Sequence, residues 1–196
     1  MPVLPRRRFL ALSAAGLALG ATPLRAQQAG AVATDRRDPL AAPVRNNISS
    51  FRTVDWRDHF DTLGVSTIIA DTSSRALSYW NADGSDYRVF PTSVPISDEL
   101  TKRGRTEVVR KRVGPDWTPT ASMVERNPDL KYMPPGPDNP LGTHAMYLSW
   151  PAYLIHGTHD TRKIGRPSSD GCIGLYNEQI AELFAITPVG TQVLIL

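Results

Sequence analysis

Cysteine is almost absent from this sequence of 196 residues, which contains only Cys172. A lone cysteine cannot form an internal disulfide, so Cys172 is either an apolar filler of the core or a reactive thiol. The residues just before it, Ser168, Ser169, Asp170 and Gly171, are polar or conformationally free. Such neighbours are uncommon around a core residue, and they favour the interpretation of Cys172 as a reactive thiol.

An excess of positive charge is also absent once the N-terminus is set aside. The formal net charge of the chain is +3, and the first 26 residues contain four arginines and no acid. Removing these four charges leaves a net charge of −1 for the remainder. The sequence therefore shows no basic footprint of the kind that binds nucleic acid, and no nucleic-acid partner is expected.

The N-terminal segment has the pattern of an export signal. Arg6, Arg7 and Arg8 precede an apolar run over residues 9–21, and Ala26 follows as a small residue. This order predicts a signal peptide over residues 1–26, and the arginines also fit a twin-arginine address. The apolar run is short for a membrane-spanning helix, although an uncleaved anchor stays an alternative. We expect a protein of the periplasm or cell envelope, without a stable membrane span after cleavage.

Beyond the signal, composition separates a tether from one folded domain. Residues 27–50 are rich in Ala, Pro, Asn and Ser without periodicity, which predicts a flexible linker. Residues 51–196 show no internal repeat and no second domain. The seventeen prolines and fourteen glycines of the chain indicate many turns. They favour a mainly β fold with one or two short helices.

Apolar and alternating segments predict the individual elements of this domain. A helix is expected over residues 177–185, because Ile180, Leu183 and Phe184 form one apolar stripe, and Asn177 is its predicted N-cap. A short helical turn is expected within residues 54–62. Strands are expected over residues 65–70, 76–80, 87–90, 106–113, 145–150, 153–155 and 192–196, with a hairpin turn at Asn81-Ala82-Asp83-Gly84.

Residues 114–140 contain seven prolines and cannot pair in the interior of a sheet. Two interpretations of this segment stay open. It is either a surface excursion or the wall or lid of a cleft, since long ordered loops in compact domains usually have a function. In the second case Trp117, Tyr132 and Met133 are its candidate wall residues.

A histidine lies within reach of the cysteine if the chain folds back. His156 precedes Cys172 by 16 residues, and an imidazole can take the thiol proton and so generate the nucleophilic thiolate. A backbone carbonyl at Gly157 would fix the tautomer of this histidine. The amide of Gly171 could face the oxyanion that forms during acyl transfer. The pattern predicts nucleophilic catalysis by a cysteine–histidine pair.

A metal site is the competing interpretation of the same residues. His156, His159, Asp160 and Cys172 are all potential zinc ligands. However, His-x-x-His with one distant cysteine is a poor match to common zinc-ligand spacings. We therefore expect no metal and no cofactor, and we interpret His159 as a loop residue.

The residues around the thiol are similar to a known family signature. His156-Gly157-Thr158, followed by Ser169-x-Gly171-Cys172-Ile173-x-Leu175, resembles the signature of L,D-transpeptidases with a YkuD-type catalytic domain. Segments 115–119, 139–142 and 190–193 are also similar to recurrent segments of that family. The resemblance implies a YkuD-like β-sandwich catalytic domain over residues 51–196.

The resemblance also implies an activity. Family members exchange the terminal residue of a peptidoglycan tetrapeptide stem for another amine, so Cys172 matches the nucleophile, His156 the general base and Gly157 the residue whose carbonyl orients that base. The expected partners are peptidoglycan stem peptides, with a second stem or the amino terminus of an envelope protein as acceptor. Two alternatives stay open. One is a peptidoglycan hydrolase or amidase that uses the same thiol, and the other is a wall-binding module with weakened catalysis.

Two positions depart from the family pattern. Where many members have Ser-His-Gly-Cys-Ile-Arg, this chain has Asp170 in place of the histidine and Gly174 in place of the arginine. If both positions face the thiol, its surroundings become more negative, and negative charge disfavours the thiolate. The resemblance therefore supports the nucleophile and the base more firmly than full turnover.

A compensating cation is expected on the loop that leads back to the thiol. Arg166 is the preferred candidate over Arg162 and Lys163, because Pro167 stiffens the chain after it and a guanidinium suits carboxylate binding. The other interpretation is that all three are solvated loop charges. The substrate-binding residues predicted from the sequence are Arg166, Ser169, Asp170 and Trp117.

Overall fold

The computed structural model describes residues 52–196. The predicted signal peptide and linker, residues 1–26 and 27–50, lie outside the described residues, and the domain boundary at residue 51 stays a prediction. Within the described range, no helix combines the length and the apolar character that crossing a membrane requires.

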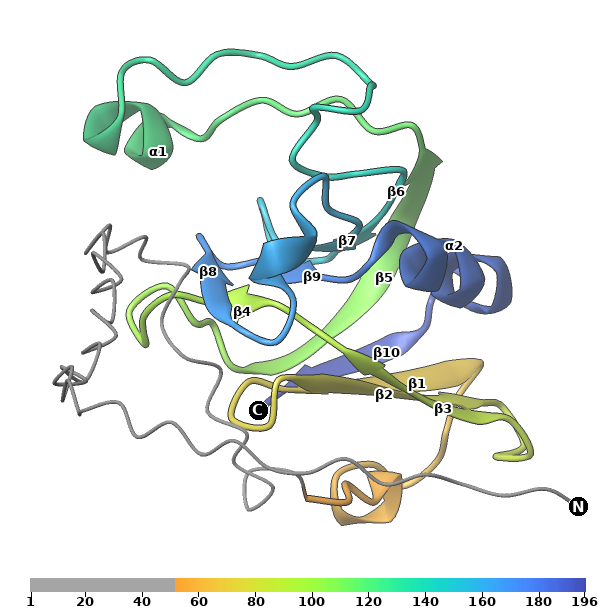
Figure 1. The fold of residues 1–196 in the computed structure, drawn as a ribbon. Coiled ribbons are helices and arrows are strands. Elements are labelled where there is room, and N and C mark those ends of the chain that lie inside the picture. Colours follow the sequence, from red (N-terminus) through yellow and green to blue (C-terminus); the bar gives the residue numbers. More distant parts are fainter. Residues whose placement is uncertain (1–51) are drawn as a thin grey trace, which may run out of the picture. The chain divides into compact units, whose positions relative to one another are not determined.

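Strands dominate the described chain and two short α-helices accompany them, so the mainly β class predicted from the sequence is confirmed (Figure 1). The helices are α1 (Ala121–Arg126) and α2 (Asn177–Ile186), and the 3-10 turns are η3 (Trp56–Asp58) and η4 (Thr161–Lys163). The strands are β1 (Ser66–Asp71), β2 (Ala76–Asn81), β3 (Tyr87–Pro91), β4 (Val94–Pro95), β5 (Gly104–Val113), β6 (His144–Leu148), β7 (Leu154–His156), β8 (Pro167–Ser169), β9 (Ile173–Gly174) and β10 (Gln192–Ile195).

Eight of these strands form one mixed sheet in the order β3-β2-β1-β10-β5-β6-β7-β9, and β4 pairs with β8 in a small parallel sheet. The last strand, β10, lies between β1 and β5, parallel to the first and antiparallel to the second. The strand predicted over residues 192–196 is therefore confirmed as β10, in the interior of the sheet. Parallel pairing also joins β7 to β9, and this pairing brings the two halves of the family-like signature together.

β5 turns the single sheet into two facing layers. Its first half pairs with β10 and its second half with β6. The register shifts between Val108 and Arg110, and such a bulge bends a strand. The sheet consequently curls around the core, with β1, β2, β3 and β10 on one side of the bend and β6 and β7 on the other (Figure 1).

The main core lies inside this curl. Fully buried side chains from both layers meet there, together with Ile180 and Leu183 of α2. A second, smaller cluster covers the opposite face of β1 and includes Phe60, Leu63 and Ile69. Every residue of β1 is buried as a result, because the strand is covered on both faces. This explains why Ile68, Ile69 and Ala70 follow one another without polar alternation in the sequence.

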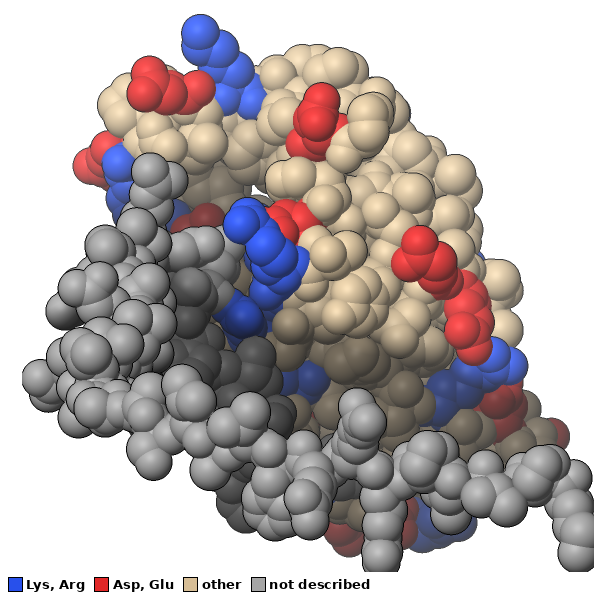
Figure 2. All heavy atoms as spheres, in the orientation of Figure 1, with Lys and Arg blue, Asp and Glu red and all other residues tan. Residues whose placement is uncertain are grey.

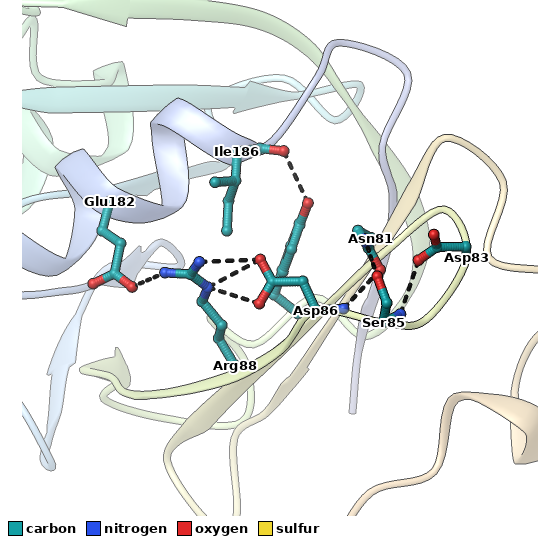
Figure 3. Close-up of polar contacts among 8 residues, drawn as sticks. Asn81, Asp83, Ser85, Asp86, Arg88, Glu182 and Ile186 are labelled. Carbon is teal, nitrogen blue, oxygen red and sulfur yellow. Dashed lines mark hydrogen bonds and ion pairs between the residues drawn. The ribbon is translucent and has the colours of Figure 1, made fainter.

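The helix α2 is fixed to the β2–β3 hairpin by polar contacts that Figure 3 shows. The Tyr79 hydroxyl donates to the carbonyl of Ile186 at 2.8 Å. Arg88 of β3 pairs with Asp86 at 3.0 Å and also contacts Glu182 of α2. The turn predicted at residues 81–84 is confirmed, since β2 and β3 are antiparallel neighbours joined by this loop.

The capping prediction for α2 is wrong. The N-cap residue is Tyr176, which makes no side-chain cap bond, and Asn177 is the first residue of the helix. The Asn177 side chain instead accepts a hydrogen bond from the Thr143 amide at 3.1 Å. A tertiary contact thus uses the side chain that local propensity assigns to capping.

The proline-dense segment 114–140 contains more structure than its composition suggests. It stays outside the sheets, as predicted, but it includes α1, whose first turn is capped by the Thr120 side chain. At its base Trp117 and Met133 form an isolated bridge through two backbone hydrogen bonds of 2.9 and 2.8 Å. The two arms of the segment are therefore held together. Strands β4, β8 and β9, of two or three residues each, were also not predicted.

Candidate active site

Strand pairing brings the cysteine and the histidine into one cleft. Ile155 pairs with Ile173 and His156 pairs with Gly174 in the parallel ladder of β7 and β9. Cys172 directly precedes β9 and lies two residues before Gly174, the partner of His156. Both Cys172 and His156 line the same pocket.

His156 is oriented by its own neighbour. The residue is 9% exposed, and its Nδ1 donates to the Gly157 carbonyl at 2.5 Å. A carbonyl only accepts, so the proton must be on Nδ1, which leaves Nε2 as the basic nitrogen. Burial lowers the pKa of His156 to about 4, partly offset by the Gly157 bond, and the Lys163 charge lowers it further. The imidazole is therefore neutral at physiological pH and able to accept a proton.

Gly157 must be a glycine for steric reasons. A Cβ at this position would lie 2.3 Å from Asn177 Oδ1, and a Cβ on Gly142 would lie 2.2 Å from the same oxygen. Asn177 thereby packs the turn that presents the Gly157 carbonyl to His156. This role of Asn177 is not evident from the sequence, where the only signal for it is the presence of glycines at 142 and 157 in family-like segments.

Cys172 is half-buried, and its Sγ lies 3.6 Å from the carbonyl of Ala152. Burial raises the pKa of the thiol to about 11; a backbone hydrogen bond at Leu154 opposes this shift and the charge of Asp170 adds to it. At neutral pH the thiol and the imidazole are thus both uncharged in the unliganded protein. Attack by sulfur then requires that His156 accept the thiol proton during the reaction.

The turn before the thiol is built from Ser169, Asp170 and Gly171. Gly171 has φ of 132°, and its amide lies 3.4 Å from the Ser169 hydroxyl, which itself donates to the Cys172 carbonyl at 2.6 Å. Asp170 forms an ion pair of 2.6 Å with Arg126 of α1. The negative charge that the sequence places beside the thiol therefore has a cationic partner from the proline-dense segment, which the sequence analysis did not identify.

Two pockets meet at Cys172. The first, which we call the histidine-side pocket, has a volume of about 370 Å³ and is lined by Ser93, Trp117, Met123, Leu130, Met133, Asp138, Pro140, Leu141, His156, Thr158, His159, Lys163, Ser168, Ser169, Asp170 and Cys172. The second, the arginine-side pocket, has a volume of about 360 Å³ and is lined by Arg110, Arg112, Asp116, Trp117, Thr118, Thr120, Met123, Leu141, Tyr147, Ala152, Leu154 and Cys172. Trp117 and Met123 line both, so the segment 114–140 is a wall of the cleft.

The space-filling view agrees with this placement. In Figure 2 the molecule is hollowed between the part that carries α1 and the part that carries β8. Lys and Arg side chains lie beside this hollow. The cleft interpretation of residues 114–140 is thus supported over a surface excursion.

The predicted binding residues are distributed unevenly around the cleft. Trp117 lines both pockets, and Ser169 and Asp170 line the histidine-side pocket. Arg166 lines neither of them, whereas Lys163 lines the histidine-side pocket. Among the two other proposed wall residues, Met133 lines that pocket and Tyr132 lines neither.

Gly174 is explained by its packing. A Cβ at this position would lie 2.4 Å from the Ser93 hydroxyl. Ser93 is fixed there by two backbone hydrogen bonds with Gly174, of 2.8 and 3.3 Å. An arginine at position 174 would therefore require Ser93 to move. In the described chain no group of three or more His, Cys, Asp and Glu side chains is placed to hold a metal ion.

The fold and the site define a class: a curled, mainly β domain whose cleft contains a carbonyl-oriented histidine at the end of one strand and a cysteine just before the neighbouring parallel strand. The L,D-transpeptidase catalytic domain of the YkuD type matches residues 66–195 of this chain. The chain belongs to this L,D-transpeptidase family.

Several relatives extend this result. A Fuscovulum blasticum protein assigned as an L,D-transpeptidase, from ORF 5 of the ATP synthase subunits region, is 66% identical over 193 residues, covering 97% of this chain and 96% of its own. Escherichia coli ErfK/SrfK, assigned to the same activity, is 38% identical over 135 residues, which are 66% of this chain and 43% of that protein. The chain thus spans less than half of the E. coli relative.

Solved structures show the same fold. An L,D-transpeptidase from Mycobacterium smegmatis superposes with a TM-score of 0.54 at 17% identity, covering 67% of this chain and 58% of its own. L,D-transpeptidase 3 from Mycobacterium tuberculosis gives a TM-score of 0.54 at 17% identity, with 67% and 61% covered. At this identity the likeness establishes the YkuD-like fold expected from the sequence.

Proposed function

We propose that the protein is a peptidoglycan L,D-transpeptidase that works through a thioester on Cys172. The observation that carries this proposal is the position of Cys172 at the junction of two pockets. A transferase needs a donor chain and an acceptor chain to reach the same carbonyl carbon. Separate pockets on either side of one sulfur allow both chains to approach it.

The first half-reaction transfers the donor to sulfur. Sγ attacks the carbonyl carbon that precedes the terminal residue of a stem tetrapeptide, and Nε2 of His156 accepts the thiol proton. The C–S bond forms, the C–N bond breaks, and His156 returns the proton to the leaving amine. The Gly157 carbonyl stabilises the transient imidazolium, because it accepts a hydrogen bond from Nδ1.

The second half-reaction reverses these roles. An acceptor amine attacks the thioester and His156 takes its proton; the C–N bond forms, the C–S bond breaks, and the proton returns to the leaving sulfur. A second stem or the amino terminus of an envelope protein can supply the amine. The same thioester with water as acceptor would give hydrolysis. Export to the envelope, which this substrate requires, rests on the predicted signal peptide.

Mass spectrometry of the products tests the proposal. The purified protein is incubated with disaccharide-tetrapeptide, and crosslinked dimers are the expected product. Monomers shortened by one residue would indicate that the thioester is hydrolysed and that no transfer to an amine takes place. Unchanged substrate, with Cys172 shown to be reduced and intact, would contradict the proposal and favour the wall-binding module.

A further inference from the structure

The histidine-side pocket contains one permanent cation. Among the described residues that line it, Lys163 is the only Lys or Arg. The acids of the pocket are Asp170, which is paired with Arg126, and Asp138, which is exposed on the segment 114–140. Lys163 therefore lines a cavity in which Asp170, the acid close to the thiol in sequence, already has a cationic partner.

Lys163 itself is left without a side-chain partner in residues 52–196. Its closest acidic neighbour in sequence, Asp160, is engaged by Arg162 through two bonds of 2.9 and 3.0 Å. No ion pair or hydrogen bond of the Lys163 ammonium is formed with the described chain. An unpaired, half-buried lysine that lines a cleft is free to bind an anionic ligand.

The backbone beneath Lys163 is nevertheless fixed. Lys163 closes the 3-10 turn η4, and its carbonyl accepts from the Arg166 amide at 3.1 Å and from the Ser168 hydroxyl at 3.3 Å. Behind this loop the Arg75 guanidinium donates to the carbonyl of Gly165 at 3.2 Å. The ammonium is thus carried on a loop tied at several points, and it lies near enough to His156 for its charge to lower the pKa of that ring.

The chemistry of the proposed reaction requires an anion at this place. His156 delivers its proton to the nitrogen of the leaving residue. When that residue is C-terminal and has a free carboxylate, its nitrogen is two bonds from the carboxyl carbon. A substrate whose scissile nitrogen contacts His156 therefore places its carboxylate within a few ångströms of the same ring. Lys163 is the lining cation beside that ring.

We propose that Lys163 binds the carboxylate of the terminal residue, and that it makes the protein selective for donors that end in a free α-carboxylate. The inference rests on the proposed function for the identity of the substrate. It replaces Arg166, the choice made from the sequence, because Arg166 lines neither pocket. It also accounts for activity without an arginine at position 174.

The first experiment compares two donors. Consumption of disaccharide-tetrapeptide is measured against that of the same molecule with a C-terminal amide, as a ratio of kcat/KM values. The parent protein should prefer the free acid by about 10- to 100-fold, the range expected for a charge-assisted bond in a partly desolvated site. Lys163→Gln should remove the preference by slowing only the acid, and Lys163→Arg should retain most of it.

Controls separate binding from fold. Lys131→Gln makes the same change at an exposed lysine of segment 114–140, and it should keep the preference of the parent. Arg166→Gln tests the rival assignment and should also keep it. Equal loss of rate on the acid and the amide in Lys163→Gln would overturn the proposal, as would loss of the preference in Arg166→Gln alone.

A second experiment needs no turnover. Bromoacetyl-D-alanine and its C-terminal amide each alkylate Cys172 with formation of an S–C bond and loss of bromide, and the ratio of their rates is normalised to that for N-acetylcysteine. Lys163→Gln should lower this ratio several-fold, and an unchanged ratio would overturn the proposal. A lowered ratio in a protein that leaves tetrapeptide untouched would instead contradict the proposed function while the carboxylate site stands.

Discussion

The two pockets that meet at Cys172 differ in what they offer a ligand. The histidine-side pocket contains the base, the unpaired Lys163 and the apolar side chains Met123 and Met133. In the arginine-side pocket the charges are already engaged, since Arg112 pairs with Asp116 at 2.6 Å and Arg110 stacks on Tyr147 at 3.5 Å. Proton transfer and carboxylate recognition are therefore concentrated on one side of the thiol. The other side contains one ion pair and the charged guanidinium of Arg110, which lies over an aromatic ring.

Removal of the group common to both pockets should have the largest effect. Cys172→Ser is expected to abolish acyl transfer while the fold is retained, because a neutral hydroxyl is a far weaker nucleophile and the site lacks a strong base. Product formation by mass spectrometry and circular dichroism of the variant provide the two measurements. A serine variant with the activity of the parent would refute the thioester mechanism.

Removal of the base affects the histidine side alone. His156→Gln should lower the rate of transfer by about 10²- to 10⁴-fold, the usual contribution of a general base. Binding of a neutral ligand in the arginine-side pocket should change little, since Gln is close in size. Single-turnover acylation measures the first effect. An equal rate in the variant would mean that the thiol is activated by another group.

His156 should also make the free energy of unfolding depend on pH. The pKa of His156 is lowered to about 4 in the folded protein, whereas an unfolded histidine titrates near pH 6.5. The unfolded chain therefore binds the proton more readily. The free energy of unfolding is therefore highest above about pH 6.5 and decreases as the pH falls toward 4. At pH 4.5 it is lower by about 2–3 kcal/mol.

Urea unfolding at pH 7.5 and 4.5 tests this dependence. The difference between the two pH values should be smaller in His156→Gln than in the parent. His159→Gln, a change at an exposed histidine of the same pocket, is the matched control and should leave the difference unchanged. Identical pH dependence in His156→Gln and the parent would contradict the burial argument.

The ion pair between Asp170 and Arg126 should produce the smallest change. Asp170 raises the pKa of the thiol, so Asp170→Asn should increase alkylation of Cys172 at pH 8 by about two- to fivefold. Arg126→Gln should slow alkylation by a similar or smaller factor. Both effects are modest because the pair is about half exposed and screened by solvent.

Salt and a matched variant give this prediction its controls. The effect of Asp170→Asn should shrink in 1 M NaCl, because ions screen exposed charges. Asp138→Asn changes another acid of the same pocket, and it should leave alkylation close to the parent rate. Equal alkylation rates in Asp138→Asn and Asp170→Asn would mean that the total negative charge of the cleft, and not the position of Asp170, sets the pKa of the thiol.

Much of the scaffold could be predicted from the sequence. Periodicity and turn residues placed β1, β2, β3, β5, β6, β7, α2 and β10 within a few residues of their observed bounds. The two-residue strands β4 and β9 were missed because so few residues carry no periodic signal. Helix α1 was missed because prolines on both sides dominate the composition of its segment.

For the site, the sequence alone supplied the chemical groups. A single cysteine, a histidine followed by glycine, and a polar turn before the thiol were sufficient to name Cys172, His156 and Gly157, and the structure places the last two in hydrogen-bond contact. These assignments depend on residue identity and on short spacings. Both can be read directly from the amino-acid sequence.

Only the tertiary structure decided which charges face the thiol. Asp170 and Arg126 are 44 positions apart and form an ion pair, and no local pattern relates them. Lys163 and Arg166 are nearly equivalent in sequence, yet the turn η4 and the β4–β8 pairing direct only Lys163 into the cleft. Side-chain direction on a loop is set by contacts with distant strands, and for this reason the sequence determined the nucleophile and its base while the fold determined the cation beside them.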